Sequence, residues 1–220
     1  KRLEKLTGDF LDYARPQLLE KMDGRALDSL LYVASACKGF AAEKGVRVDV
    51  EAAPELTINM DAGKVQQALL NLVKNAIEAS PPEESVILRA RPAETGTMRL
   101  EVQNSGPPIP KQDLEQIFEP FFTTKRGGTG LGLAIARNIA RAHDGDLFLR
   151  VNGFGRVCFA FELPTTASMA TSAASESASA PRLRWCASQS SRSIRAATRQ
   201  SIFRRETRPG RSNPTPTQPC

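Results

Sequence analysis

The feature that most limits how this 220-residue chain can fold is a change in composition after Pro164. The segment 165–220 is rich in Ser, Ala, Arg and Pro, and its nine arginines and two glutamates give it a net charge of +7. It shows neither a helical nor an alternating apolar period, so it cannot bury enough surface to offset the entropy lost on ordering. We therefore expect 165–220 to be a disordered basic tail, with an RNA- or membrane-binding arm as the alternative.

The body before this tail is nearly neutral, because residues 1–164 hold 21 Lys and Arg against 22 Asp and Glu. This balance gives no indication of a nucleic-acid surface. The chain also lacks a run of roughly 18 apolar residues that could span a membrane, and it does not begin like a signal peptide. Its four cysteines are scattered, which argues against a zinc site or a disulfide framework. We expect a cytoplasmic chain without nucleic-acid or membrane contacts, although the full-length protein could be membrane-anchored.

Apolar periodicity in the body predicts both helices and strands. Asp61 is placed to cap a long helix, and Gly45 and Pro81 follow predicted helix ends. Because strands and helices do not alternate strictly, we expect an α+β fold, a two-layer α/β sandwich with helices on one face of a mixed sheet. The predicted helices cover residues 24–44, 61–80, 111–117 and 130–142, and the predicted strands cover 46–50, 86–91, 98–104, 147–151 and 156–163.

The first residues predict a separate short helix. Leu3, Leu6, Phe10 and Tyr13 are spaced 3, 4 and 3 residues apart, as in the apolar seam of a coiled coil or helical bundle, and Pro16 ends the pattern. Two heptads are too short for an independent coiled coil. We therefore expect this segment to be the end of a longer helix that begins before residue 1.

Residues 71–79 place three polar side chains on one face of a predicted helix. Asn71, Asn75 and Glu78 are spaced i, i+4 and i+7, while apolar residues occupy the opposite face. Two amides and a carboxylate in line can serve a polar ligand or a hard cation that prefers oxygen ligands. A simple solvated helix face explains the same pattern.

Three further segments carry weaker signals. Residues 102–110 end a strand in a tight Gly/Pro turn, which needs no function. Residues 117–125 combine three phenylalanines with two threonines and a lysine, which fits either the anchor of a mobile loop or ordinary core. Residues 127–133 are rich in glycine before a predicted helix, so their backbone N–H groups could approach a phosphate. The glycine pattern is neither a P-loop nor a Rossmann fingerprint.

Taken in order, the four segments resemble the N, G1, F and G2 boxes of sensor histidine kinases, and are similar to those of nitrogen-regulation-type kinases. The segments read Asn-Leu-x-x-Asn-Ala, Asn-Ser-Gly-Pro-Pro-Ile-Pro, Ile-Phe-Glu-Pro-Phe-Phe-Thr-Thr-Lys and Gly-Thr-Gly-Leu-Gly-Leu, with matching order and spacing over residues 46–164. The resemblance implies the Bergerat ATP-binding fold for residues 17–164. It also implies that residues 1–16 are the end of the helical hairpin that carries dimerisation and the phosphoacceptor.

The resemblance also implies roles for individual residues. Asn75 matches the amide that ligates Mg²⁺, and Asn71 matches a polar position on the same face, where an amide cannot activate water. Asn104 stands where the family often has an aspartate that contacts the adenine amino group, and its carbonyl oxygen can still accept that hydrogen bond, though without charge. Gly106 leaves room for the base. The nucleotide-binding residues implied in this way are Asn71, Lys74, Asn75, Asn104, Gly106, Ile109, Thr123, Thr124, Lys125, Gly128, Thr129, Gly130, Leu131, Gly132 and Leu133. Thr123 to Lys125 would begin the nucleotide lid, and Pro108 departs from the glycine usual in that turn.

His143 follows the predicted helix 130–142, a context unlike that of a phosphoacceptor, and we expect it to have a structural role at the helix C-terminus. The resemblance therefore implies a module that binds ATP and Mg²⁺ and presents the γ-phosphoryl group to a histidine outside this chain, and then to a response-regulator aspartate. The implied partners are the response regulator, a phosphoacceptor histidine domain and a second copy in the full-length dimer. A truncated, non-catalytic nucleotide- or regulator-binding module is the alternative, and an anti-sigma-type serine kinase is a third possibility.

Overall fold

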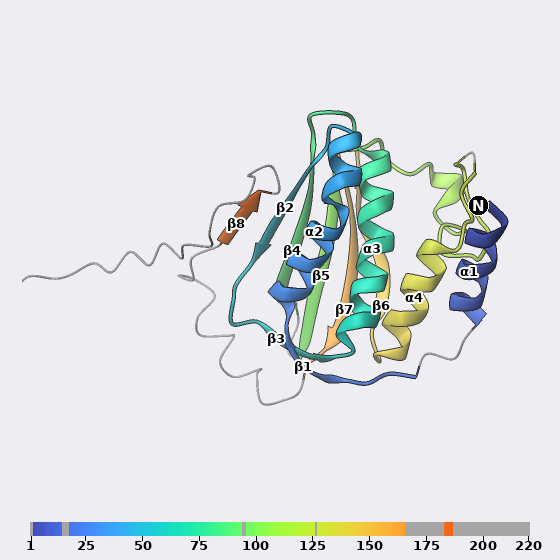
Figure 1. The fold of residues 1–220 in the computed structure, drawn as a ribbon. Helices are drawn as coiled ribbons and strands as arrows, with labels where there is room; N and C mark the ends of the chain where they lie inside the picture. The colour runs from blue at the N-terminus through green and yellow to red at the C-terminus, as the bar shows by residue number, and fades with distance from the viewer. Residues whose placement is uncertain (1, 15–17, 94–95, 126, 166–182, 187–220) are drawn as a thin grey trace, which may run out of the picture. The chain divides into compact units, whose positions relative to one another are not determined.

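The computed structural model of the chain describes residues 2–14, 18–93, 96–125, 127–165 and 183–186. A mixed sheet lies at the centre of this described part, with six strands in the order β6-β7-β5-β4-β2-β8 (Figure 1). β2 and β4 run parallel, and every other neighbouring pair is antiparallel. The strands are β2 (Arg47–Ala52), β4 (Ser85–Pro92), β5 (Thr97–Asn104), β6 (Asp146–Gly153), β7 (Arg156–Pro164) and β8 (Leu183–Cys186).

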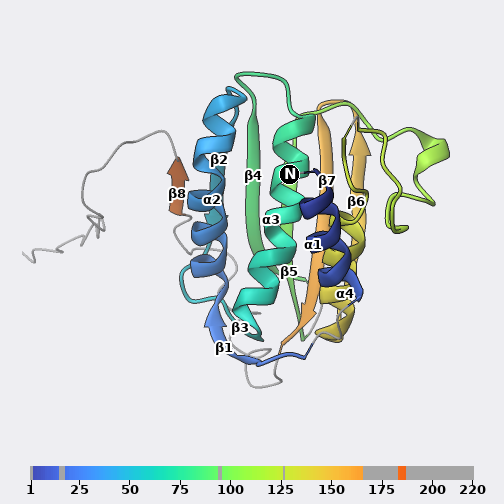
Figure 2. The same ribbon diagram turned by 45° about the vertical axis from the view of Figure 1, so that its right-hand side comes forward.

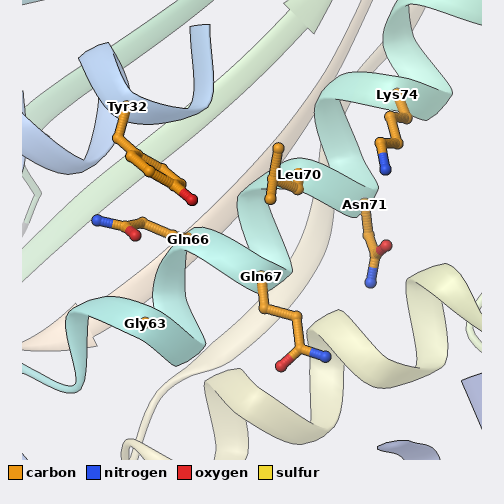
Figure 3. A pocket seen from close by; sticks show the side chains of 7 residues that line it. All are labelled: Tyr32, Gly63, Gln66, Gln67, Leu70, Asn71 and Lys74. Atoms are coloured by element: carbon orange, nitrogen blue, oxygen red, sulfur yellow. The ribbon is translucent and has the colours of Figure 1, made fainter. Parts of the chain in front are cut away.

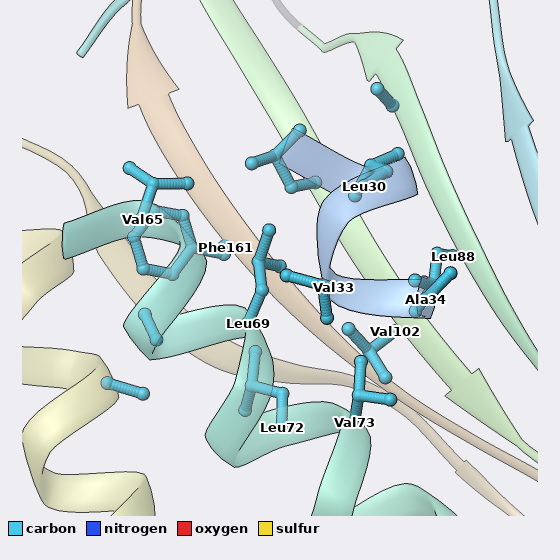
Figure 4. Close-up of a cluster of buried hydrophobic side chains, with 14 of the residues drawn as sticks. Leu30, Val33, Ala34, Val65, Leu69, Leu72, Val73, Leu88, Val102 and Phe161 are labelled. Carbon is cyan, nitrogen blue, oxygen red and sulfur yellow. The ribbon is translucent and has the colours of Figure 1, made fainter. Parts of the chain in front are cut away.

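Three helices cover one face of this sheet, as the two-layer prediction requires (Figure 2). They are α2 (Ala26–Glu43), α3 (Ala62–Ala79) and α4 (Gly132–Ala142). Alternate residues of each strand point at the helices, so Leu100 and Val102 of β5 are buried against them. Figure 4 shows Leu69 and Leu72 of α3 in this core beside Phe161 of β7. The apolar residues that recur about every 3.6 positions in the helices and every second position in the strands thus pack together in a single layer.

The short helix at the N-terminus, α1 (Arg2–Ala14), contacts α4. Its end before Pro16 agrees with the sequence prediction. Phe10 stacks on Phe121 with 6.4 Å between the ring centroids. α1 therefore contacts the segment that directly precedes the predicted start of the nucleotide lid at Thr123.

Two elements differ from the sequence prediction. The helix expected from residue 24 begins at Ala26, because β1 (Met22–Arg25) pairs with β3 (Thr57–Met60) in a small antiparallel sheet that the sequence did not indicate. The helix expected at 111–117 is only a short 3-10 turn, η1 (Lys111–Asp113), which follows Pro110 and has no buried residue. Without an apolar face to bury, so short a helix gains little from packing.

One part of the predicted tail is also different. Leu183–Cys186, expected to be disordered, forms β8 and pairs antiparallel with β2, where Trp185 lies opposite Val50. The prediction relied on side-chain periodicity, whereas an edge strand offers unpaired backbone N–H and C=O groups to any extended segment. The rest of 166–220 lies outside the described residues.

None of the helices in the described part of the chain is long and apolar enough to cross a membrane.

Candidate functional site

The polar face of α3 forms one wall of the candidate site. Asp61 caps the helix, because its Oδ1 accepts a hydrogen bond of 3.0 Å from the backbone N–H of Lys64, as predicted. Asn71 and Asn75 are half-buried and Glu78 is exposed. Packing of the opposite face fixes the rotation of the helix and so directs these three side chains outward. That packed face consists of Val65, Ala68, Leu69, Leu72, Val73, Ala76 and Ile77.

Lys125 connects the segment after the phenylalanines to this wall. Its Nζ donates a hydrogen bond of 2.9 Å to Oδ1 of Asn75 and forms an ion pair with the Glu78 carboxylate. Its backbone N–H donates to Oγ1 of Thr123 at 3.1 Å, so the residue sits in a tight turn. Two segments about 50 residues apart in sequence therefore meet at one cluster of charges.

The glycine-rich segment packs against the same turn and the same helix. Gly130 has a φ of +68°, and a Cβ there would lie 2.3 Å from the backbone carbon of Phe121, whose N–H donates to the Gly130 carbonyl oxygen at 3.0 Å. A Cβ on Gly128 would lie 2.6 Å from Oγ1 of Thr123. Gly132 begins α4, and its Cβ position is 3.7 Å from Cγ of Asn71. The structure thus brings three of the four sequence segments together around the N-terminus of α4, where backbone N–H groups favour anions.

The fourth segment contributes a buried amide with an unfilled hydrogen bond. Asn104 ends β5 and is 4% exposed, and its Nδ2 has no hydrogen-bond partner among the described residues. A Cβ on Gly106 would lie 2.3 Å from the carbonyl oxygen of Ala79 and 2.7 Å from Nδ2 of Asn104, so only glycine fits. An unpaired buried donor is costly in a folded protein, and a ligand that accepts from it would remove that cost.

Asn152 holds the loop after this amide, and the sequence gave no indication of that role. Its Oδ1 accepts from the N–H of Ile109 at 2.7 Å, and its Nδ2 donates to the Ile109 carbonyl oxygen at 2.8 Å. The pair Asn152-Gly153 lies between the predicted strands 147–151 and 156–163, where such a dipeptide usually marks only a hairpin turn. The two hydrogen bonds tie Ile109 to the end of β6.

The remaining predicted residues have different positions. Thr124 is exposed, whereas Leu131 is fully buried and anchors the glycine segment in the core. Leu133 is half-buried and packs against the same core. The hydroxyl of Thr129 donates to Oδ2 of Asp9 in α1 at 2.7 Å, a contact that the sequence did not predict.

Lys74 lies on the α2 side of α3. It lines a surface hollow of about 300 Å³ between the two helices (Figure 3). Burial raises the pKa of the Cys37 thiol of α2, and the positive charge of Lys74 opposes this rise. The hollow is lined by Tyr32, Gly63, Gln66, Gln67, Leu70, Asn71 and Lys74. Lys74 therefore faces this hollow, while Asn75 and Glu78 meet Lys125.

His143 has the structural position expected for it. It caps α4 and is 2% exposed. Its Nε2 accepts a hydrogen bond of 3.0 Å from the backbone N–H of Asp61, and its Nδ1 lies 2.8 Å from the carbonyl oxygen of Ile139. A backbone N–H can only donate and a carbonyl can only accept, so these contacts assign the neutral ring with the proton on Nδ1. Burial, the largest cause, lowers the pKa of His143.

Comparison with known proteins gives a consistent picture. A family described as "Histidine kinase-, DNA gyrase B-, and HSP90-like ATPase" matches residues 60–167. Sporulation kinase B of Bacillus subtilis (strain 168) is 32% identical over 148 residues, which cover 66% of this chain and 34% of that kinase. The chain thus spans about a third of the length of this curated relative.

Solved structures show the same similarity. The nucleotide-free catalytic domain of the histidine kinase ThkA is 34% identical with a TM-score of 0.62, and the match covers 68% of this chain and 98% of that domain. Full-length ShkA in complex with AMPPNP is 30% identical with a TM-score of 0.68, over 75% of this chain and 36% of ShkA. ThkA in complex with the response regulator TrrA is 32% identical with a TM-score of 0.64, over 76% of this chain and 48% of that chain.

Proposed function

Because this chain belongs to the family of histidine kinase catalytic domains, we propose that residues 17–164 bind Mg-ATP and present its γ-phosphoryl group to a histidine outside this sequence. The observation that carries the proposal is the convergence of two distant segments on the polar face of α3. Lys125 contacts Asn75 and Glu78, and the glycine at the start of α4 lies against Asn71. On this proposal, residues 1–16 belong to the neighbouring dimerisation hairpin.

Asn104 is suited to the adenine ring. Its amide oxygen can accept from the amino group of adenine, and its free Nδ2 can donate to a ring nitrogen beside that group. Gly106 lets the loop pass close to this amide, since a side chain there would collide with Ala79 and with Nδ2 of Asn104. Asn152 supports the same loop through Ile109.

The opposite side of the site is suited to phosphates and a hard cation. The oxygen of Asn75 would serve as a Mg²⁺ ligand, and backbone N–H groups of Gly130 and the first turn of α4 would face the phosphates. Bound Mg²⁺ neutralises phosphate charge and fixes the geometry of the transferred group. Asn71 is an amide and cannot act as a general base, so the site favours holding ATP over hydrolysing it.

The partners follow from the same proposal. We expect a response regulator to receive the phosphoryl group from the acceptor histidine, in line with the solved complex of ThkA and TrrA. The phosphoacceptor domain and a second copy of the full-length protein complete the proposed assembly. His143 is not the acceptor on this proposal, because both of its ring nitrogens already have backbone partners.

Calorimetry of the full chain with ATP, with and without Mg²⁺, tests nucleotide binding. We expect Asn75→Ala to weaken binding more in Mg²⁺ than in EDTA, and the control Asn59→Ala, on the distant β3, to change neither value. Absence of binding at millimolar nucleotide would disprove the proposal.

Phosphoryl transfer needs its own experiment. With γ-labelled ATP, the chain alone should acquire no acid-labile label, and an added phosphoacceptor domain from a related kinase should acquire it. If ATP binds but no acceptor domain is labelled, the alternative of a non-catalytic nucleotide-binding module is favoured. Label that His143→Ala removes would show that our interpretation of His143 is wrong.

A further inference from the structure

The ammonium group of Lys125 occupies the position on α3 that is suited to a metal ion. Its Nζ lies 2.9 Å from Oδ1 of Asn75 and is ion-paired with Glu78. These two oxygen-bearing side chains are three residues apart on one helix, so they are neighbours on its surface. An amide oxygen and a carboxylate are also the ligands that a hard divalent cation prefers. The lysine therefore satisfies the same oxygens that a divalent cation would use.

We propose that Lys125 is a built-in competitor for divalent cations at Asn75 and Glu78, and that a cation binds there only by displacing its ammonium group. The inference rests on the proposed Mg-ATP binding and adds two elements to it. Glu78 becomes a second oxygen donor of the cation site, and the lid lysine becomes the group that the cation releases.

The two positive charges cannot share this site. Mg²⁺ requires near-octahedral oxygen ligands at short range, so it must take the Asn75 oxygen that now accepts from Lys125. A divalent cation and an ammonium a few ångströms apart also repel each other strongly. Binding of one therefore excludes the other from Asn75.

The contact is also weak enough to be displaced. The side chains of Lys125 and Glu78 are 43% and 39% exposed, and ion pairs at such exposure contribute little stability. A buried pair would resist displacement, because separation would leave an unpaired charge away from water. The exposure of this pair thus fits a reversible contact rather than a permanent structural one.

Release of the ammonium group would also change how the turn that contains Lys125 is attached to α3. The Lys125 N–H donates to Thr123, and its carbonyl oxygen accepts from the Gly128 N–H at 3.2 Å. The side chain therefore ties a preformed turn to α3. Once displaced, the ammonium stays on a residue whose Cβ lies 3.4 Å from the Cβ position of Gly128, so it can reach phosphate oxygens held at the glycine segment.

Binding of Mn²⁺ alone to the full chain, measured from the electron paramagnetic resonance signal of free Mn²⁺, tests the competition without nucleotide or activity. We expect Lys125→Met to bind Mn²⁺ about threefold more tightly than the wild type, the size expected for loss of an exposed ion pair. Lys125→Arg keeps the positive charge and should match the wild type. Lys38→Met removes an exposed lysine from α2 and should also match it.

A second variant tests the role of Glu78. Glu78→Gln should weaken Mn²⁺ binding, and the gain from Lys125→Met should be smaller in the Glu78→Gln background, as measured with the double variant Lys125→Met/Glu78→Gln. Equal Mn²⁺ affinities for Lys125→Met and Lys38→Met, or no Mn²⁺ binding by either, would overturn the proposal. A gain that is undiminished in the Glu78→Gln background would overturn the part assigned to Glu78.

Binding of a fluorescent ATP analogue to the wild type in EDTA and in Mg²⁺ separates this inference from the proposed function. If the analogue does not bind in either condition, the proposed function fails. If it binds while Lys125→Met leaves the Mn²⁺ affinity unchanged, only the competition between Lys125 and the cation is wrong.

Discussion

The two ends of the α3–α4 pair are built in opposite ways. At one end, His143 of α4 is buried and hydrogen-bonded to the backbone of Asp61, which itself caps α3. At the other end, the start of α4 meets Asn71 through Gly132, beside the exposed contact between Lys125 and Glu78. Polar groups at the first end satisfy one another inside the protein. Those at the second end remain accessible, so the same two helices provide stability at one end and a binding surface at the other.

Backbone conformation shows the same contrast. Asp144 and Phe121 both have positive φ values, 63° and 68°. An aspartate adopts this conformation with little strain, whereas a bulky aromatic residue does so rarely. Strained residues often occur at segments that bind or move. Phe121 lies at the accessible end, where Gly130 and Phe10 hold it.

The largest effect should come from adding one methyl group at the end of the α3–α4 pair that contains His143, which we call the closed end. A Cβ on Gly145 would lie 1.8 Å from the carbonyl oxygen of Glu162 in β7. We expect Gly145→Ala to lower the free energy of unfolding by about 3 kcal/mol in urea titrations, because backbone atoms must move. Gly39→Ala in α2 is the control, since no atom lies within 4 Å and alanine favours helix. An unchanged stability for Gly145→Ala would show that this end is not tightly packed.

The matched change at the accessible end should affect binding more than stability. Gly130 combines a φ of +68° with a Cβ position 2.3 Å from Phe121. We expect Gly130→Ala to weaken ATP binding by more than about tenfold in calorimetry, since the glycine segment can no longer approach the ligand. Its effect on the urea midpoint should be smaller than that of Gly145→Ala. The reverse order of the two effects would contradict the division between the two ends.

The buried histidine should make the closed end sensitive to acid. Burial lowers the pKa of His143, so the unfolded chain binds a proton more readily than the folded chain. Stability should be fully present above the ordinary histidine pKa of about 6.5 and should be lost as the pH falls below it. Lys21 opposes protonation of His143, and the carboxylates of Asp61 and Asp144 favour it.

Urea midpoints at successive pH values between 7.5 and 5 would measure this loss. His143→Gln should remove the pH dependence in this window, because His143 is the one histidine of the chain. The pKa values of Asp61 and Asp144 are lowered, so their own titration falls at more acidic pH. A pH dependence that survives in His143→Gln would assign the effect to other groups.

The sequence predicted the elements with strong periodicity and missed the contacts between them. The cap at Asp61, the polar face of α3 and the alternating strands β4 and β5 follow from local patterns. The contact of Lys125 with Asn75 joins residues 50 positions apart, and that of Thr129 with Asp9 joins residues 120 apart. No local pattern encodes such pairs, because they depend on how the helices and the sheet pack.

The four segments of the candidate site could be recognised in the sequence because their order and spacing resemble those of a known family, although each alone is ambiguous, but their geometry could not be predicted. Asn152 shows the limit most clearly: the dipeptide with Gly153 predicts a turn, and only the fold brings it to Ile109. The short strands β1 and β3 have four residues each, too few to show an alternation. Their pairing depends on the neighbouring helix and cap.

The smallest effect should come from the tail. β8 pairs four residues with the edge of β2, while β2 keeps its parallel partner β4 on the other side. Ordering residues costs about 1–2 kcal/mol each in backbone entropy, so an edge strand of four residues adds little net stability.

We therefore expect deletion of residues 165–220 to leave nucleotide affinity unchanged and to lower the melting temperature by at most a few degrees. Amide exchange should become faster in β2 and stay unchanged in β5, which lies inside the sheet. A fall of many degrees would show that the tail contributes much of the stability of the body and that the predicted boundary at Pro164 is misplaced, whereas unchanged exchange in β2 would contradict the pairing with β8.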